Sequence, residues 1–159
     1  MPTGWWHDLG MFKHLLVATD GSSHAATAGG HAVDIARTQD ARLTLVSVWQ
    51  TYTSWAGLAP SAPLDEELLA QARARADKAV EAAAAQVPQT VTLEKRLLDG
   101  VPADAILREL ERDDYDLVVM GSRGRGGIGS LLLGSVSMNV LHHARVPVLI
   151  VHPPEESHR

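Results

Sequence analysis

The chain contains 159 residues, of which 45% are hydrophobic and 21% are charged, and it carries a formal net charge of -5. This length suits one α/β domain with its own core, and the hydrophobic content argues against disorder. The negative charge, without any block of Lys and Arg, argues against a nucleic-acid partner, and the lack of cysteine excludes disulfides, thiolate nucleophiles and cysteine-bound metals.

The first ten residues stand apart from the periodic part of the chain, which begins after Met11. They include Trp5, Trp6 and Asp8, but neither the basic region nor the apolar region of a secretory signal peptide. No apolar run is long enough for a transmembrane helix. We therefore expect residues 1–10 to form a flexible extension, and we expect the protein to be cytoplasmic, with no membrane partner.

The first half of the chain predicts two strands, each followed by a helix. Short apolar runs with β-branched residues indicate the strands, and alanine-rich stretches indicate the helices. The predicted elements are a strand at 13–19, a helix at 23–38, a strand at 42–49 and a helix at 64–86. Between the last two, residues 50–63 contain Gly57, Pro60 and Pro63 and predict a loop that is either a lid or merely mobile.

The second half continues this alternation. The predicted elements are an outer strand at 90–97, a helix at 103–112, a strand at 117–120 that is buried on both faces, a helix at 135–143 and a strand at 148–151. Such alternation specifies a parallel sheet with helices on both faces. In a doubly wound sheet of this kind, ligands bind at the carboxyl ends of the strands, near a topological switch point.

A glycine-rich stretch between the fourth strand and the last helix is the most informative motif. It contains Gly121, Gly124 and Gly134, and it ends in Ser135 at the start of the predicted helix. Glycine permits positive φ angles and lets the backbone approach phosphate oxygens, and a helix N-terminus attracts negative charge. The stretch therefore predicts a nucleotide phosphate site, with a flexible loop that binds no ligand as the alternative.

Side chains near this predicted site each have two candidate roles. Asp20 follows the first strand and either binds the nucleotide or caps the first helix. Arg123 and Arg125 either neutralise phosphate charge or point into water. His24 lies one turn after Asp20, and we expect it to be exposed to solvent rather than in contact with a ligand.

The spacing Gly121-x2-Gly124-x9-Gly134-Ser135 resembles the signature of the ATP-binding branch of the universal stress protein family. Segments 16–22 and 146–151 resemble that family's first and last strands. The resemblance covers residues 11–153 as one universal stress protein domain and leaves residues 154–159 as a C-terminal tail. It implies a single doubly wound five-stranded parallel sheet of order 3-2-1-4-5, with the adenine nucleotide alpha hydrolase-like fold.

The resemblance also implies which residues bind ATP. Adenine and ribose contacts are implied at the ends of the first two strands and just before the glycine stretch, at Ala18, Thr19, Asp20, Val48 and Met120. The implied phosphate cradle is made of Gly121, Gly124, Gly134, Ser135 and Val136. A carboxylate at Asp20 suits either the ribose hydroxyls or Mg²⁺ bound to the phosphates, so Mg²⁺ is expected to accompany ATP.

A homodimer through the last strand, Val146 to Val151, is a further implication. This apolar strand carries no charge, which is an independent reason for a partner, because an uncharged edge strand needs a cover. We expect a nucleotide-responsive factor in stress adaptation. The alternatives are a slow ATPase or adenylyl hydrolase on the same fold, and a nucleotide-free dimerisation module.

Motifs of other enzyme classes are missing from the sequence. There is no Gly-x-Ser-x-Gly elbow, no P-loop and no zinc-hydrolase histidine pair. The glycine stretch offers no group that would orient a nucleophile, so we predict no catalytic residue and no fast ATP hydrolysis. Trp49, Tyr52 and Trp55 either cap an adenine face or pack against the sheet edge.

Overall fold

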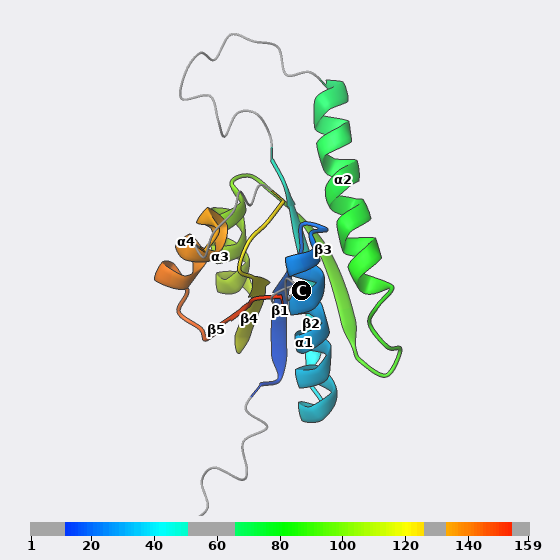
Figure 1. Cartoon of the computed structure of the whole chain (residues 1–159), viewed down its shortest axis with the longest axis vertical. Helices are drawn as coiled ribbons and strands as arrows, with labels where there is room; N and C mark the ends of the chain where they lie inside the picture. Colours follow the sequence, from blue (N-terminus) through cyan, green and yellow to red (C-terminus); the bar gives the residue numbers. More distant parts are fainter. Residues whose placement is uncertain (1–11, 51–65, 126–132, 154–159) are drawn as a thin grey trace, which may run out of the picture.

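Strands and helices alternate along the residues that the structure, a computed structural model, describes: 12–50, 66–125 and 133–153 (Figure 1). The elements are β1 (His14–Ala18), α1 (Ser23–Gln39), β2 (Arg42–Trp49), α2 (Glu66–Ala84), β3 (Leu93–Asp99), α3 (Pro102–Arg112), β4 (Leu117–Gly121), α4 (Ser135–His143) and β5 (Val148–Val151). The predicted order is confirmed. The expectations for residues 1–10, for most of the 50–63 loop and for the tail lie outside the described residues.

The strands form one parallel sheet of order β3-β2-β1-β4-β5, as expected. Strand β1 lies at its centre, where Leu15 is level with Leu43 of β2 on one side and with Leu117 of β4 on the other. The chain runs outward from β1 through β2 to β3, and then returns to β4 on the opposite side of β1. This reversal places the topological switch point between β1 and β4, so the loops after these two strands border the same crevice.

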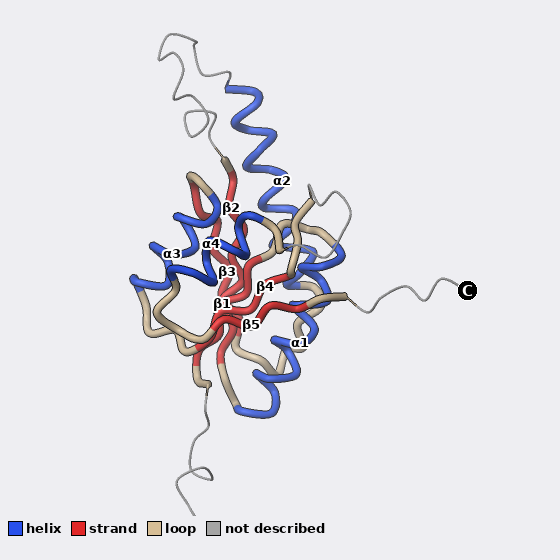
Figure 2. The backbone as a smooth tube through the Cα atoms, turned by 60° about the vertical axis from the view of Figure 1, so that its left-hand side comes forward, coloured by secondary structure: helices blue, strands red, loops and turns tan. Residues whose placement is uncertain are grey.

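Two hydrophobic clusters hold the helices against the two faces of the sheet (Figure 2). Successive side chains of a strand point to opposite faces, so Leu15 and Val17 enter one cluster while Leu16 enters the other. The first cluster includes the alanine stripe of α1 and receives the end of α2. The second cluster is completed by side chains of α3 and α4. Strands β1 and β4 are therefore covered on both faces, which agrees with their uninterrupted apolar sequences.

The third strand begins later than its sequence pattern predicts. We expect it to start at Thr90, but the ladder with β2 starts at Leu93. The N–H of Val91 donates to the carbonyl of Pro88 at 3.0 Å, which closes a turn before the strand can begin. The position of β3 at a sheet edge agrees with the prediction of an outer strand.

A buried histidine lies at the start of β1, on the α3 side of the sheet. His14 is only 2% exposed, and its Nε2 lies 2.8 Å from the hydroxyl of Thr44. The guanidinium of Arg42 lies 3.0 Å from Nδ1, and the ring packs against Tyr115 with centroids 4.1 Å apart. Burial, followed by the positive charge of Arg42, lowers the pKa of His14 from its ordinary value of 6.5.

This histidine predicts a loss of stability in mild acid. Because the pKa of His14 is lower in the folded state, the unfolded state binds the proton first as the pH falls through about 6.5. We expect the melting temperature to drop between about pH 7.5 and about pH 5.5, and the drop to be smaller in His14→Asn. His31→Asn is the matched control, because His31 is exposed on α1. Equal drops in the wild type and His14→Asn would contradict this assignment.

Candidate functional site

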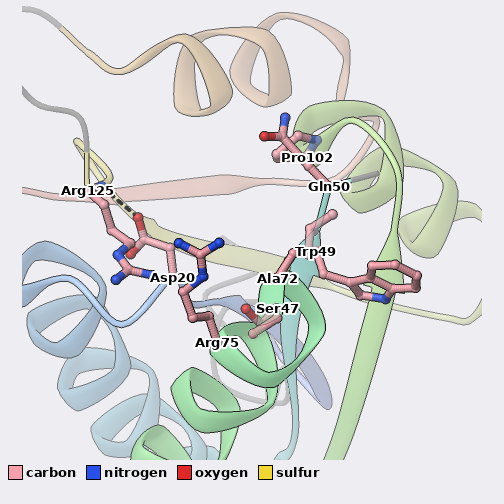
Figure 3. A pocket seen from close by; sticks show the side chains of 10 residues that line it. Asp20, Ser47, Trp49, Gln50, Ala72, Arg75, Pro102 and Arg125 are labelled. Carbon is pink, nitrogen blue, oxygen red and sulfur yellow. Dashed lines mark hydrogen bonds between the residues drawn. The ribbon is translucent and has the colours of Figure 1, made fainter. Parts of the chain in front are cut away.

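A cavity of about 440 Å³ lies at the carboxyl ends of the strands (Figure 3). Its walls come from the second residue after β1, the end of β2, one face of α2, the first residue of α3 and the glycine-rich loop after β4. The lining residues are Asp20, Ser47, Val48, Trp49, Gln50, Ala72, Arg75, Ala76, Pro102 and Arg125. The cavity therefore occupies the region of the sheet in which a ligand is expected.

Asp20 ties the two loops of the switch point together. Its Oδ1 accepts a hydrogen bond from the N–H of Ser22 at 3.0 Å, and its Oδ2 accepts one from the N–H of Arg125 at 2.9 Å (Figure 3). The helix cap is Ser22 instead, whose hydroxyl accepts from the N–H of Ala25 at 3.2 Å. The capping alternative for Asp20 is therefore wrong, and its carboxylate faces the cavity while it holds the glycine-rich loop in place.

Two of the predicted glycines lie where an added side chain would meet a neighbour at short range. A Cβ at Gly121 would lie 2.7 Å from the carbonyl carbon of His24, so this glycine lets α1 approach the end of β4. A Cβ at Gly124 would lie 2.6 Å from Oδ2 of Asp20. The sequence argument from positive φ is wrong at Gly121, Gly124 and Gly134, because among the described residues glycine has positive φ only at Gly21 and Gly100.

Gly134 differs from the other two because it leaves room for a side chain. Its φ of -62° is accessible to any residue, and the atom nearest to a Cβ at this position would be Cα of Arg123 at 3.4 Å, an ordinary contact. Gly134 is the N-cap of α4, and no side chain caps the helix there. The first N–H groups of α4 thus remain available to an external acceptor.

The remaining predicted residues divide between the cavity and the core. Val48 lines the cavity, and Ser135 is exposed at the start of α4. Met120 is only 4% exposed and belongs to the second hydrophobic cluster, against which Val136 also packs. The side chains of Met120 and Val136 are therefore part of the core, and neither residue lines the cavity.

The ends of β1 and α1 are anchored by further polar contacts. Thr19 donates its N–H to the carbonyl of Val46 at 2.9 Å, which continues the pairing with β2 beyond Ala18. The Nδ1 atom of His24 lies 3.1 Å from the hydroxyl of the buried Ser122. The expectation of a solvent-exposed His24 is therefore wrong, since its ring is half-buried against the start of the glycine-rich loop.

Two further candidates from the sequence, Trp49 and Arg125, lie at the cavity. Trp49 contributes to the cavity wall, and the guanidinium of Arg73 lies 5.9 Å from its ring centroid. Arg125 lines the cavity. Tyr52 and Trp55 lie outside the described residues.

Sequence reasoning missed the contribution of α2 and the anchor of α4. Helix α2 carries no motif, although Ala72 and Ala76 are small residues one turn apart, a spacing that lets a helix face approach a cavity. Ser137 is buried in α4 and donates its hydroxyl to the carbonyl of Gly121 at 2.8 Å. Neither position has a signal in the sequence that distinguishes it from ordinary helix packing.

The described residues contain no group of three or more His, Cys, Asp or Glu side chains placed to hold a metal ion. Within the same part of the chain, none of the helices combines the length and apolar character needed to cross a membrane.

Comparisons with known proteins agree on one family. The model of the universal stress protein family matches residues 11–152. The "universal stress protein in QAH/OAS sulfhydrylase 3′ region" of Thermus aquaticus is 40% identical over 141 residues, which cover 89% of this chain and 99% of that protein. The solved structure of hypothetical protein MJ0577 has a TM-score of 0.78 and 24% identity, covering 91% of this chain and 99% of its own. A universal stress protein solved in complex with cAMP has a TM-score of 0.57 and 27% identity, and the match covers 89% of this chain and 97% of that protein.

Proposed function

The chain belongs to the universal stress protein family, and from that premise we propose that it binds ATP in the cytoplasm as a nucleotide-responsive factor in stress adaptation. The observation that carries the proposal is the cavity beside the glycine-rich loop, where Asp20 and Arg125 supply polar groups. The helix that follows this loop, α4, begins without a side-chain cap. A relative with 27% identity was solved with cAMP, which supports an adenine nucleotide as the ligand class.

The proposal gives the two ends of the nucleotide different partners. Adenine and ribose would contact the residues at the ends of β1, β2 and β4, namely Ala18, Thr19, Asp20, Val48 and Met120. The phosphates would lie against the glycine-rich loop and the first turn of α4, at Gly121, Gly124, Gly134, Ser135 and Val136. The uncapped start of α4 supports this orientation of the nucleotide, because its N–H groups and the helix dipole favour an anion.

Asp20 also fits the proposed Mg²⁺ ion. Each of its oxygens accepts one main-chain hydrogen bond and retains a second lone pair. Mg²⁺ at a nucleotide is held by phosphates and water with one or two carboxylates, so a single Asp is sufficient. When bound, Mg²⁺ would neutralise phosphate charge next to this carboxylate.

We propose a binding role rather than an enzymatic one. Both oxygens of Asp20 accept main-chain N–H groups, so this carboxylate holds the glycine-rich loop in place, and no other described residue that lines the cavity is a candidate general base. A phosphate-release assay with added inorganic pyrophosphatase distinguishes this role from the alternative of a slow ATPase or adenylyl hydrolase, because it detects both phosphate and pyrophosphate. Turnover that disappears in Asp20→Ala would favour the enzyme, while no turnover above the buffer rate supports binding alone.

Nucleotide retention tests the proposed function. We expect protein purified without added nucleotide to release ATP on acid denaturation, identified by mass spectrometry. An apo sample, prepared by denaturation and refolding, should bind ATP again in a calorimetric titration. A wild-type protein that carries no adenine nucleotide and gives no heat with ATP, ADP or AMP would contradict the proposal and favour the nucleotide-free dimerisation module.

A homodimer through β5 is part of the same proposal. Strand β5 is an edge of the sheet, and its residues Val148, Leu149 and Ile150 are only half-buried. An apolar edge strand with exposed main-chain groups is a template for pairing with a second copy. Met138 and Leu141 of α4, the helix that precedes β5, are also exposed apolar residues.

A further inference from the structure

Arg75 is a cation at the wall of the cavity that no sequence motif indicates. It stands on α2 between Ala72 and Ala76, which both line the cavity, and its side chain extends toward Asp20 (Figure 3). Within the described residues its guanidinium forms one hydrogen bond, from Nε to the carbonyl of Gln71 at 3.4 Å, and no ion pair. The group is therefore held on its own helix and keeps most of its donors for another partner.

The charges around the cavity are unequal. Arg75 and Arg125 are cationic, Asp20 is anionic, and the other described lining residues are neutral. The Asp20 oxygens accept hydrogen bonds from main-chain N–H groups, and neither arginine side chain forms an ion pair with this carboxylate among the described residues. The lining thus carries one excess positive charge, which favours an anionic ligand.

Arg73, two residues earlier on the same helix, has a different environment. Its guanidinium lies over the ring of Trp49 at 5.9 Å, and it does not line the cavity. Residues two apart on a helix point about 200° from each other, so the two arginines face different surroundings. Arg73 of α2 packs against Trp49 of β2, whereas Arg75 lines the cavity.

We infer that Arg75 is a specificity-determining residue that makes the site prefer adenine nucleotides with two or three phosphates over those with one. The inference rests on the proposed function, since it assigns a role within the same site. AMP places its one phosphate at the glycine-rich loop and α4, and these contacts do not need Arg75. The additional phosphates of ADP and ATP add oxygens and charge that the guanidinium of Arg75 can contact directly, beside the proposed Mg²⁺ at Asp20.

Calorimetric titration of ATP and of AMP into matched variants tests the inference. Arg75→Gln should raise the Kd for ATP about tenfold and change the Kd for AMP less than about twofold. Arg75→Lys keeps the charge but loses the bidentate geometry, so its Kd for ATP should fall between those of the wild type and Arg75→Gln. Arg73→Gln is the control, and it should leave both constants within about twofold of the wild type.

Three results would contradict the proposed role of Arg75 in specificity. An unchanged Kd for ATP in Arg75→Gln would show that the side chain does not contact the phosphates. Equal losses for ATP and AMP would show that it supports the cavity structurally, and a matching loss in Arg73→Gln would point to α2 as a whole. In all three, wild-type protein still binds ATP and the proposed function stands. Failure of the wild type to bind any adenine nucleotide would instead refute the proposed function, and the role of Arg75 with it.

Discussion

Gly134→Val is expected to abolish ATP binding while the protein keeps its fold. The backbone φ of -62° suits valine, and the substituted Cβ meets only ordinary contacts with Arg123, Ser122 and Gly124. The valine methyl groups would then project beside the start of α4, where we propose that the phosphates lie. We expect the Kd for ATP to rise at least about a hundredfold, equivalent to about 2.8 kcal/mol, in a calorimetric titration.

The choice of glycine decides how clear this test is. Gly30→Val is the matched control, because Gly30 is exposed on α1 and a Cβ there would have no atom within 4 Å. It should retain ATP affinity. Gly124→Val is less informative than its place in the motif predicts, since its Cβ would collide with Asp20, and Gly121→Val would displace α1. If Gly134→Val has a wild-type circular dichroism spectrum and an unchanged affinity for ATP, the phosphates do not lie beside Gly134.

If the proposed homodimer forms through β5, Ile150→Glu is expected to convert it into a monomer. The carbonyls of Pro147 and Val151 accept hydrogen bonds from β4 and the residue after it, so the main-chain groups of Val148 and Ile150 face the open edge of the sheet. A carboxylate at this edge would have to lose its water when a second copy approaches, and it would face its own symmetry mate. Sedimentation velocity should show one species at the monomer mass, and Val148→Glu should behave in the same way.

The opposite edge of the sheet supplies a control for this substitution. Leu98 of β3 is also half-buried and packs against the second hydrophobic cluster, as Ile150 does. Leu98→Glu should cost similar packing energy and leave the dimer intact. If both variants dissociate, loss of stability rather than loss of an interface explains the result, and a dimer that persists in Ile150→Glu would exclude β5 as the interface.

The elements of the fold could be predicted from local patterns because each pattern has a local cause. The apolar run of β4 is buried on both faces, and the alanine stripe of α1 lies against the sheet. Only boundaries were displaced, as at β3, where a turn that begins at Pro88 delays the strand to Leu93. The predicted strand order, which was implied by the family resemblance rather than by spacing, is also confirmed.

Side-chain partners at the candidate site could not be predicted in the same way. Asp20 is a plausible cap from its sequence position, yet the cap is Ser22, and the Asp20 carboxylate instead reaches an amide 105 residues away at Arg125. His24 looks exposed in the sequence, yet its ring contacts Ser122, which follows β4. Each correction involves a contact between segments whose distance in space depends on how the sheet is ordered.

Hydrophobic periodicity and glycine spacing by themselves determined the parallel α/β layers and the position of the glycine-rich loop after β4, since both depend on backbone geometry within a few residues. Tertiary structure alone decided why Gly121 must be glycine, that Gly124 lies against the Asp20 carboxylate, and that Arg75 of α2 borders the same cavity as Asp20 and Arg125. The physical reason is that close packing and charge balance are properties of atoms brought together by the fold, and the residues concerned lie roughly 50 to 100 positions apart in the chain.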